Sequence, residues 1–297
     1  MLSDLFLLFQ QHIGIYYLTA FLLGLIVGSF LNVVIYRLPI MLKAGWKSEC
    51  QAFLAEEAGQ PLPDSNATPI FNLNTPRSRC PHCNHAISAW ENIPLISYLF
   101  LRGRCRKCKT PISLRYPAIE LFTAILTLAC AWHFGVNATA GFAILLSWAL
   151  VALAFIDLDE QYLPDSITLP FLWLGLLLNT QNLFTDLESA VIGAAAGYLV
   201  LWSVYMLFKK LTGKEGMGFG DFKLLAMLGA WLGWQMLPAI ILLSSIVGAT
   251  IGILLIASNR HQRGIPIPFG PFLAAAGWIA LLWGSDLNHA YLQWIAV

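Results

Sequence analysis

Long apolar segments alternate with short polar connections along most of the chain. The first uninterrupted segment, Tyr16–Tyr36, has no charged residue. It is long enough to cross a hydrocarbon core of about 30 Å as a helix. Seven more segments are each predicted to be a helix: Pro117–Phe134, Thr139–Asp157, Pro164–Asn179, Glu188–Phe208, Asp221–Trp234, Leu237–Ala257 and Gly270–Trp283. We therefore predict an all-α polytopic membrane protein with about eight transmembrane helices.

The region between the first two predicted helices has a different composition, with charges, prolines and polar residues. We expect the first helix to end at Arg37-Leu38-Pro39, and Lys43–Thr75 to be poorly ordered. The predicted domains are an N-terminal transmembrane helix (1–36), a small extramembrane domain (37–116) and a seven-helix membrane domain (117–297). The opening residues lack a basic n-region and a small-residue cleavage site, so we expect the first apolar segment to remain as a membrane helix.

The composition agrees with this assignment, since 58% of the residues are hydrophobic and only 11% are charged. Ordinary soluble domains are far less apolar. Basic residues are retained in cytoplasmic loops. Eleven of the 17 Lys and Arg lie in 37–115, and others are Lys209, Lys210, Lys214, Arg260 and Arg263. With eight helices and the N-terminus in the periplasm, every basic residue lies on the cytoplasmic side, and the outer loops contain only acids.

Acidic residues fall at predicted helix ends on this cytoplasmic side, namely Asp157, Asp165 and Asp221. Two neighbouring carboxylates in a water-poor site share one proton, which suits aspartic hydrolysis. The simplest alternative for Asp221 is a helix N-cap, because Asp is favoured there. The nearby Gly216, Gly218 and Gly220 allow backbone conformations or close approaches closed to other residues.

Several motifs together resemble the bacterial branch of the type IV prepilin peptidase family. They are Gly28–Pro39 (GSFLNVVIYRLP), Phe155–Asp165 (FIDLDEQYLPD), Gly218–Lys223 (GFGDFK) and two CxxC pairs. The resemblance implies that Asp157 and Asp221, far apart in sequence, are the catalytic aspartates of a bifunctional inner-membrane enzyme. Asp159 and Asp165 are the competing acids, and Lys223 receives no catalytic role.

Such an enzyme cleaves the basic leader from type IV prepilins and pseudopilins at the cytoplasmic membrane face. It then N-methylates the new N-terminal residue with S-adenosylmethionine. The alternatives are a prepilin-type peptidase without methyl transfer and a general GxGD intramembrane protease. A transporter would place acids near the bilayer midplane and show an internal repeat, and the sequence has neither. A zinc scaffold without activity leaves the acids unexplained.

Four cysteines in two CxxC pairs predict one structural Zn²⁺ site: Cys80, Cys83, Cys105 and Cys108. His82 and His85 are possible substitutes, whereas Cys50 and Cys130 are expected to fill space. A cytoplasmic location keeps thiols reduced and disfavours disulfides. Basic residues surround the second pair, and in a membrane-tethered domain we expect anionic lipid, not nucleic acid, as their partner.

Methyl transfer rests on the resemblance alone, because the sequence has no glycine-rich strand–turn–helix motif of a soluble methyltransferase. We expect S-adenosylmethionine to bind between the cysteine domain and the membrane rim, near Glu120. Glu120 could equally be a helix residue satisfied by a neighbour.

Overall fold

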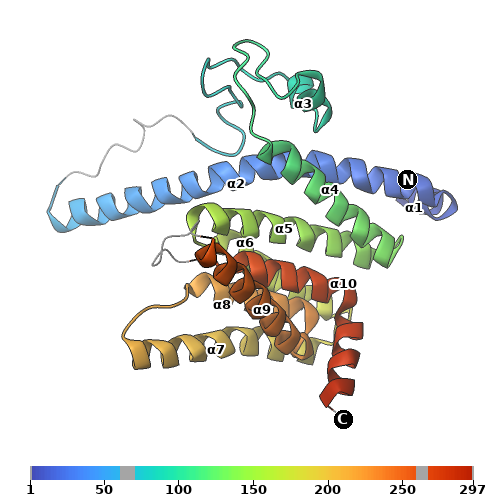
Figure 1. The fold of residues 1–297 in the computed structure, drawn as a ribbon, viewed down its shortest axis with the longest axis vertical. Helices are drawn as coiled ribbons and strands as arrows, with labels where there is room; N and C mark the ends of the chain where they lie inside the picture. The colour runs from blue at the N-terminus through green and yellow to red at the C-terminus, as the bar shows by residue number, and fades with distance from the viewer. Residues whose placement is uncertain (1, 61–70, 259–266, 296–297) are drawn as a thin grey trace. The chain divides into compact units, whose positions relative to one another are not determined.

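The computed structural model describes residues 2–60, 71–258 and 267–295. These residues form helices and turns, with no β-strand among them beyond two isolated bridges (Figure 1). The chain divides into two compact units, Met1–Ala129 and Cys130–Val297. Arg260 and Arg263, expected in a cytoplasmic loop, lie outside the described residues, as does part of the segment expected to be poorly ordered.

The first unit contains α1 (Leu2–Gln11), α2 (Ile13–Glu57), η2 (Ala89–Asn92), α3 (Ile96–Phe100) and most of α4 (Arg115–Phe134). The second contains α5 (Ala138–Glu160), α6 (Asp165–Asn179), α7 (Leu187–Thr212), α8 (Phe219–Leu232), η3 (Trp234–Met236), α9 (Leu237–Ala257) and α10 (Gly270–Ile295). In the described part of the chain, five helical segments are long and apolar enough to cross a membrane: α2, α4, α5, α7 and η3 with α9. The protein is therefore a helical membrane protein.

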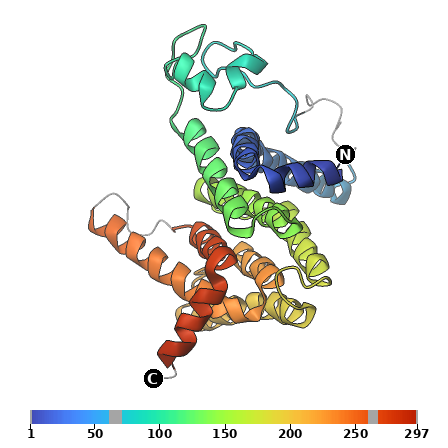
Figure 2. The ribbon, with the colours of Figure 1, turned by 90° about the vertical axis from the view of Figure 1, so that its right-hand side faces the viewer.

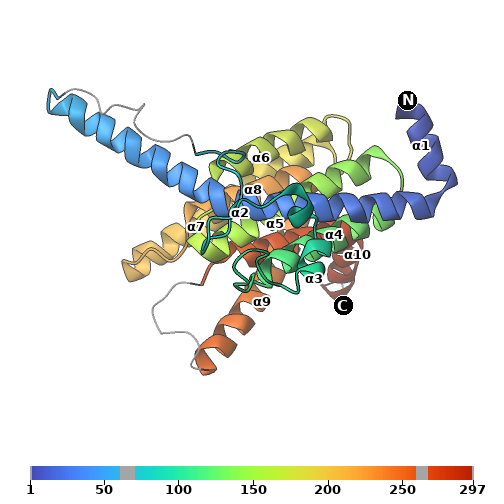
Figure 3. The ribbon, with the colours of Figure 1, turned by 90° about the horizontal axis from the view of Figure 1, so that it is seen from above.

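The first membrane helix is longer than predicted. α2 continues through Pro39 to Glu57, well past the predicted end at Tyr36, and Figure 3 shows it as one long helix. Its second half is rich in the helix-favouring residues Ala, Leu, Lys and Glu. Arg37, where the helix was expected to end, is only 8% exposed, and its guanidinium donates to the carbonyls of Asn72 (2.9 Å) and Pro76 (2.6 Å).

Two glycines of α2 allow α4 to pack closely against it. A Cβ at Gly24 would lie 2.6 Å from the Cα of Ala124, and one at Gly28 would lie 2.7 Å from the Cα of Glu120. Asn32, one turn further along, donates to the Tyr116 carbonyl at 3.1 Å. The GSFLN motif is thus a helix-packing surface in the first unit.

In the second unit, α8 is the central helix and packs against α6, α7 and α10. It has buried side chains on every side, including Phe222, Leu225 and Trp231. The buried Asn179 at the end of α6 donates to the Ala230 carbonyl at 2.9 Å and accepts from the Phe184 backbone at 3.0 Å. This fixes one end of α8 while Asp221 sits in its first turn.

Small residues account for the close contact of α7 and α8. Gly193 and Gly229 face each other so closely that a Cβ on either would overlap the other's backbone. A Cβ on Gly197 would lie 2.6 Å from the Leu225 carbonyl oxygen. Small residues on α7 therefore let the two helices pack closely.

Most of the other predicted helix bounds agree with the structure to within a few residues. The predicted helix Leu237–Ala257 is α9 without change. α10 extends to Ile295 instead of ending at Trp283, but Trp283 has non-helical dihedral angles (φ −122, ψ 21), so the predicted end coincides with a kink.

Candidate functional site

Asp157 lies in the last turn of α5 and is 5% exposed. Its Oδ2 accepts a hydrogen bond from the backbone N–H of Gly270, the first residue of α10, at 3.0 Å. The same helix end is closed by Gln161, whose left-handed backbone (φ 55) lets its N–H donate to the Asp157 carbonyl. Two different elements therefore fix the backbone and the carboxylate of this residue.

Asp221 lies in the first turn of α8 and is 8% exposed. The N-cap is Gly218, not Asp221, and the Asp221 backbone N–H donates to the Gly218 carbonyl at 3.3 Å. The alternative that Asp221 is the N-cap is therefore wrong, although Asp221 does lie in the first turn of the helix.

The two buried carboxylates belong to one site. The charge of Asp157 acts directly on Asp221. The buried side chain of Leu163 connects the two motifs, because Cβ atoms placed on Gly220 and on Gly270 would lie 2.9 Å and 3.2 Å from it. Residues that are far apart in sequence, on α5, α8 and α10, therefore meet around one leucine.

Two glycines at the start of α8 and in the loop before it, Gly220 and Gly216, are needed for space. None of Gly216, Gly218 and Gly220 has a positive φ, so the expectation of a special backbone conformation is wrong for this loop. A Cβ on Gly216 would lie 2.8 Å from the Phe208 ring, and one on Gly220 would meet Leu163. The loop is also held by Glu215, which accepts from Lys209 of α7 at 2.7 Å.

The competing acids are more exposed than Asp157 and Asp221. Asp165 and Lys223 form an ion pair, with Nζ 2.7 Å from Oδ1 and 2.6 Å from Oδ2. The ion pair accounts for the lysine that stands two residues after Asp221. The sequence did not predict this contact. Asp159 is exposed near the end of α5.

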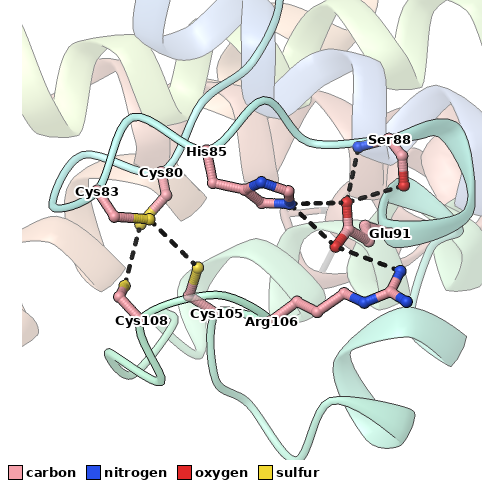
Figure 4. A network of polar contacts seen from close by, with 8 residues as sticks. All are labelled: Cys80, Cys83, His85, Ser88, Glu91, Cys105, Arg106 and Cys108. Atoms are coloured by element: carbon pink, nitrogen blue, oxygen red, sulfur yellow. Dashed lines mark hydrogen bonds and ion pairs between the residues drawn. The ribbon is translucent and has the colours of Figure 1, made fainter.

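The four predicted metal-ligating cysteines come together in the first unit. Their Sγ atoms all lie within 4.8 Å of one another, with 3.7 Å between Cys80 and Cys108 and 3.9 Å between Cys83 and Cys105 (Figure 4). Each pair forms the same turn. The residues that follow the pairs, Asn84 and Lys109, have positive φ and donate to the carbonyl of the first cysteine.

The electrostatics of this cluster suit a cation. Backbone N–H groups of Cys83 and His82 lower the pKa of the Cys80 thiol, and Thr110 lowers the pKa of the Cys108 thiol to about 6. At Cys83, a hydrogen bond from the His85 backbone is outweighed by burial and the other thiols, which raise its pKa to about 11. Four thiolates this close repel one another, so full ionisation needs a positive charge among them. The donor set and spacing fit a metal ion of the soft or borderline class, in a closed four-sulfur site.

The histidines near the cluster take no part in it. Among the described residues, the side chains that lie close enough together to hold a metal ion are the four cysteines. Instead, His85 Nε2 contacts the Glu91 carboxylate at 3.2 Å, and Glu91 Oε2 accepts from the backbone and hydroxyl of Ser88 at 2.8 Å each (Figure 4). Arg106 approaches Glu91 at 3.9 Å. This network therefore links the two cysteine pairs to each other through His85 and Arg106.

Three further residues singled out in the sequence are Glu120, Cys130 and Cys50. Glu120 is buried in α4 and accepts from the Leu95 backbone N–H at 2.9 Å, so the alternative of a helix residue satisfied by neighbours holds. Cys130 is buried, with Sγ 3.2 Å from Ser147 Oγ, as expected for a space-filling residue. Cys50 is exposed on α2, so the same expectation is wrong for it.

Comparison with known proteins agrees with these features. The bacterial peptidase A24 N-terminal domain family matches residues 22–134, and the type IV leader peptidase family matches residues 144–253. Proteins named prepilin leader peptidase/N-methyltransferase are 58% identical in Stutzerimonas stutzeri (93% of both chains), 58% in Aeromonas hydrophila (94% of both) and 56% in Pseudomonas aeruginosa (93% of both). No solved structure matches the chain. At this identity over nearly the whole length, the chain belongs to the type IV leader peptidase family.

Proposed function

We propose that this protein is a membrane aspartic endopeptidase that removes the leader from type IV prepilins and pseudopilins and then N-methylates the new N-terminal residue. The observation that carries the proposal is the pair of buried, electrostatically interacting carboxylates of Asp157 and Asp221. Relatives that share more than half of their residues with this chain bear a name that combines both activities.

In the proposed reaction the two aspartates share one proton. The ionised member takes a proton from water, which attacks the carbonyl carbon of the scissile peptide bond. The protonated member donates to the developing oxyanion, and no covalent intermediate forms with the enzyme because water is the attacking group. The tetrahedral intermediate then breaks its C–N bond as the carboxyl that took the proton from water gives it to the leaving amine, and the other carboxylate takes back the proton of the hydroxyl. The Gly270 N–H holds one oxygen of Asp157 and orients this carboxylate before substrate arrives.

The proposed topology has about eight transmembrane helices, formed by α2 and α4–α10, with the N-terminus in the periplasm. Basic loops then lie in the cytoplasm of a bacterial inner membrane, as does the cysteine domain between the first two helices. A prepilin enters the bilayer with its basic leader inside and its apolar helix in the lipid. Its scissile bond thereby reaches the rim where Asp157 and Asp221 lie.

We assign Zn²⁺ to the four-cysteine cluster as a structural ion, because a closed four-sulfur site has no open coordination position. S-adenosylmethionine would supply the methyl group for the second reaction. The polar groups around Glu120 already engage one another, which does not favour the expected site there, and no residue of this chain is assigned to that donor.

The test uses the purified full chain in lipid with a purified prepilin and S-adenosylmethionine, and mass spectrometry of the product. We expect a shortened pilin carrying one added methyl group on its new N-terminus, and a shortened but unmethylated pilin when the donor is left out. An intact prepilin would contradict the peptidase assignment. Cleavage without methylation in the presence of the donor would contradict the second activity alone.

A further inference from the structure

The short helix α3 presents an apolar face that no described side chain covers. Ile96, Leu99 and Phe100 have the helical spacing that places side chains on one face. They are 51%, 74% and 85% exposed. The opposite face carries Tyr98, whose hydroxyl donates to the Ile112 carbonyl at 3.4 Å and contacts Gly103. α3 is thus anchored in the cysteine domain by one face, and its other face is free.

The 3₁₀ helix that adjoins α3 carries another large exposed apolar side chain. Trp90, in the adjoining η2, is 81% exposed, and η2 packs against α3. Figure 2 shows this part of the chain, residues 71–114, as a small lobe beyond the start of α4. Trp is enriched at membrane–water interfaces, where its ring lies at the level of the lipid headgroups.

The start of α3 is fixed to a transmembrane helix by a buried carboxylate. Leu95, directly before α3, donates its backbone N–H to Glu120 Oε2 of α4 at 2.9 Å. Leu95 has φ 57 and ψ −47 and lies at the centre of a tight turn closed by a 2.5 Å hydrogen bond from the Ile96 N–H to the Pro94 carbonyl. This turn is a γ-turn of the strained kind, so the carboxylate holds a conformation that the sequence alone does not favour.

The position of Glu120 sets the depth of α3. α4 begins at Arg115, more than one turn before Glu120. Because a helix rises about 1.5 Å per residue, Glu120 lies about 7 Å inside the start of this apolar helix. Figures 1 and 2 show α3 in the small lobe next to the end at which α4 begins. Interfacial helices bury their apolar faces about 5–10 Å into the boundary between headgroups and acyl chains. The two depths agree when α4 enters the leaflet at its first residue, Arg115.

The surroundings of α3 are strongly basic. Residues 71–116 contain eight Lys and Arg and one acid, Glu91, whose carboxylate is occupied by Ser88 and His85. Six of the basic side chains follow α3 in sequence and are exposed: Arg102, Arg104, Arg106, Lys107, Lys109 and Arg115. An apolar face with basic neighbours matches the charge of an anionic lipid surface.

We propose that α3, with Trp90, is a membrane-interface anchor that inserts Ile96, Leu99 and Phe100 into the leaflet that α4 enters, and that the Glu120–Leu95 contact sets its depth. The occupant of the exposed face is anionic lipid. The domain between the first two transmembrane helices is then attached to the bilayer surface as well as tethered at its two ends. The anchor requires that the chain crosses a membrane, but it does not require the proposed catalysis. The anchor and the catalytic function can therefore be refuted separately.

The test places the photoreactive residue p-benzoylphenylalanine at Phe100 of the full chain in nanodiscs of phosphatidylethanolamine and phosphatidylglycerol. Lys107, exposed in the same domain, is the control position. After illumination, mass spectrometry of the peptides should find at least several-fold more lipid adduct at position 100 than at 107. Equal yields would overturn the proposal, as would adducts formed only with an added prepilin or with a second copy of the chain.

Two further arms test the charge and the depth. Discs of phosphatidylcholine alone should give a several-fold lower yield at position 100, and an unchanged yield would overturn the role of the basic residues. Glu120→Ala should lower the yield in anionic discs, whereas Glu120→Gln should keep it, because an amide oxygen still accepts from the Leu95 N–H. Equal yields in both variants would overturn the role assigned to Glu120.

Discussion

The backbone N–H of Gly270 donates to Asp157 Oδ2 at 3.0 Å, across 113 residues of sequence. A Cβ on Gly270 would lie 2.6 Å from that oxygen and 3.1 Å from Asp157 Cγ. The first residue of α10 must therefore be small, because the contact needs its backbone to reach the carboxylate. Neither aspartate motif contains Gly270, so this contact adds a positioning residue to the site.

The contact predicts the effect of Gly270→Ala. The added methyl group must displace the Asp157 carboxylate, and a displacement of about 1 Å at a reacting group can lower the rate by about 100-fold. We expect kcat for prepilin cleavage to fall by about 10-fold or more while the protein still folds. Gly141→Ala is the matched control, because a Cβ at Gly141 in α5 meets nothing within 4 Å. Wild-type cleavage by the Gly270 variant would contradict the inferred geometry.

The contact of α7 with α8 predicts a loss of stability in Gly229→Ala. A Cβ there would overlap the Gly193 backbone. Overpacking of this kind costs about 1–3 kcal/mol. Thermal unfolding in detergent should show a lower midpoint for this variant, and the Gly141→Ala control should unfold like the wild type. An unchanged midpoint in Gly229→Ala would mean that the two helices are further apart than described.

The cysteine cluster predicts one bound metal ion per chain, and elemental analysis of the purified protein measures it. Cys105→Ser should remove most of the metal, because the ion loses one of four sulfurs. Cys50→Ser should retain it, since Cys50 is exposed outside the cluster. Assays of cleavage and methylation after chelation then show which activity needs the folded cysteine domain.

The Glu91 network predicts a charge-dependent stabilisation of the cysteine domain. Hydrogen bonds from the Ser88 backbone and hydroxyl, with a contribution from His85, lower the pKa of Glu91 to about 2 from its usual 4.5. Because the folded-state pKa is the lower one, the stabilisation is present above about pH 4.5 and is lost as the pH falls toward 2. Glu91→Gln keeps an acceptor oxygen but removes the charge that strengthens both Ser88 hydrogen bonds and attracts His85 and Arg106. At pH 7 this variant should therefore speed hydrogen exchange of the Ser88 amide, measured by mass spectrometry.

A matched variant separates this effect from a general loss of charge. Glu56→Gln removes an exposed carboxylate near the end of α2 and should leave exchange at Ser88 unchanged. Equal exchange in wild type and Glu91→Gln would show that the carboxylate does not hold this turn.

Hydropathy predicted most of the apolar helices well. A transmembrane helix must form its backbone hydrogen bonds within itself and exclude charged residues over its whole length. α6 ends at Asn179 and α9 covers Leu237–Ala257, as predicted. The spacing of the two CxxC pairs likewise predicted which sulfurs would meet. These features depend on local composition, which the sequence displays directly.

Features that were not predicted from the sequence are those decided by a contact between distant residues or by a local preference other than hydropathy. The second half of α2 was missed because apolarity ends near Arg37, whereas helix propensity does not. The Asp165–Lys223 pair joins positions 58 residues apart. The Leu95–Glu120 contact depends on a turn with positive φ at a leucine, which no sequence rule favours. Local patterns carry no information on such pairings.

The most direct test of the central claim compares prepilin cleavage rates for Asp157→Asn and Asp221→Asn with those for Asp159→Asn and Asp165→Asn, all as folded protein in lipid. Each pair removes the same charge from the same region, but only the first pair changes the two buried, interacting carboxylates. We predict that either variant of the first pair loses cleavage by at least about 1,000-fold, as expected when an acid–base pair loses one member. The second pair should stay within a few-fold of the wild type. Full cleavage by either Asp157→Asn or Asp221→Asn would contradict the aspartic mechanism.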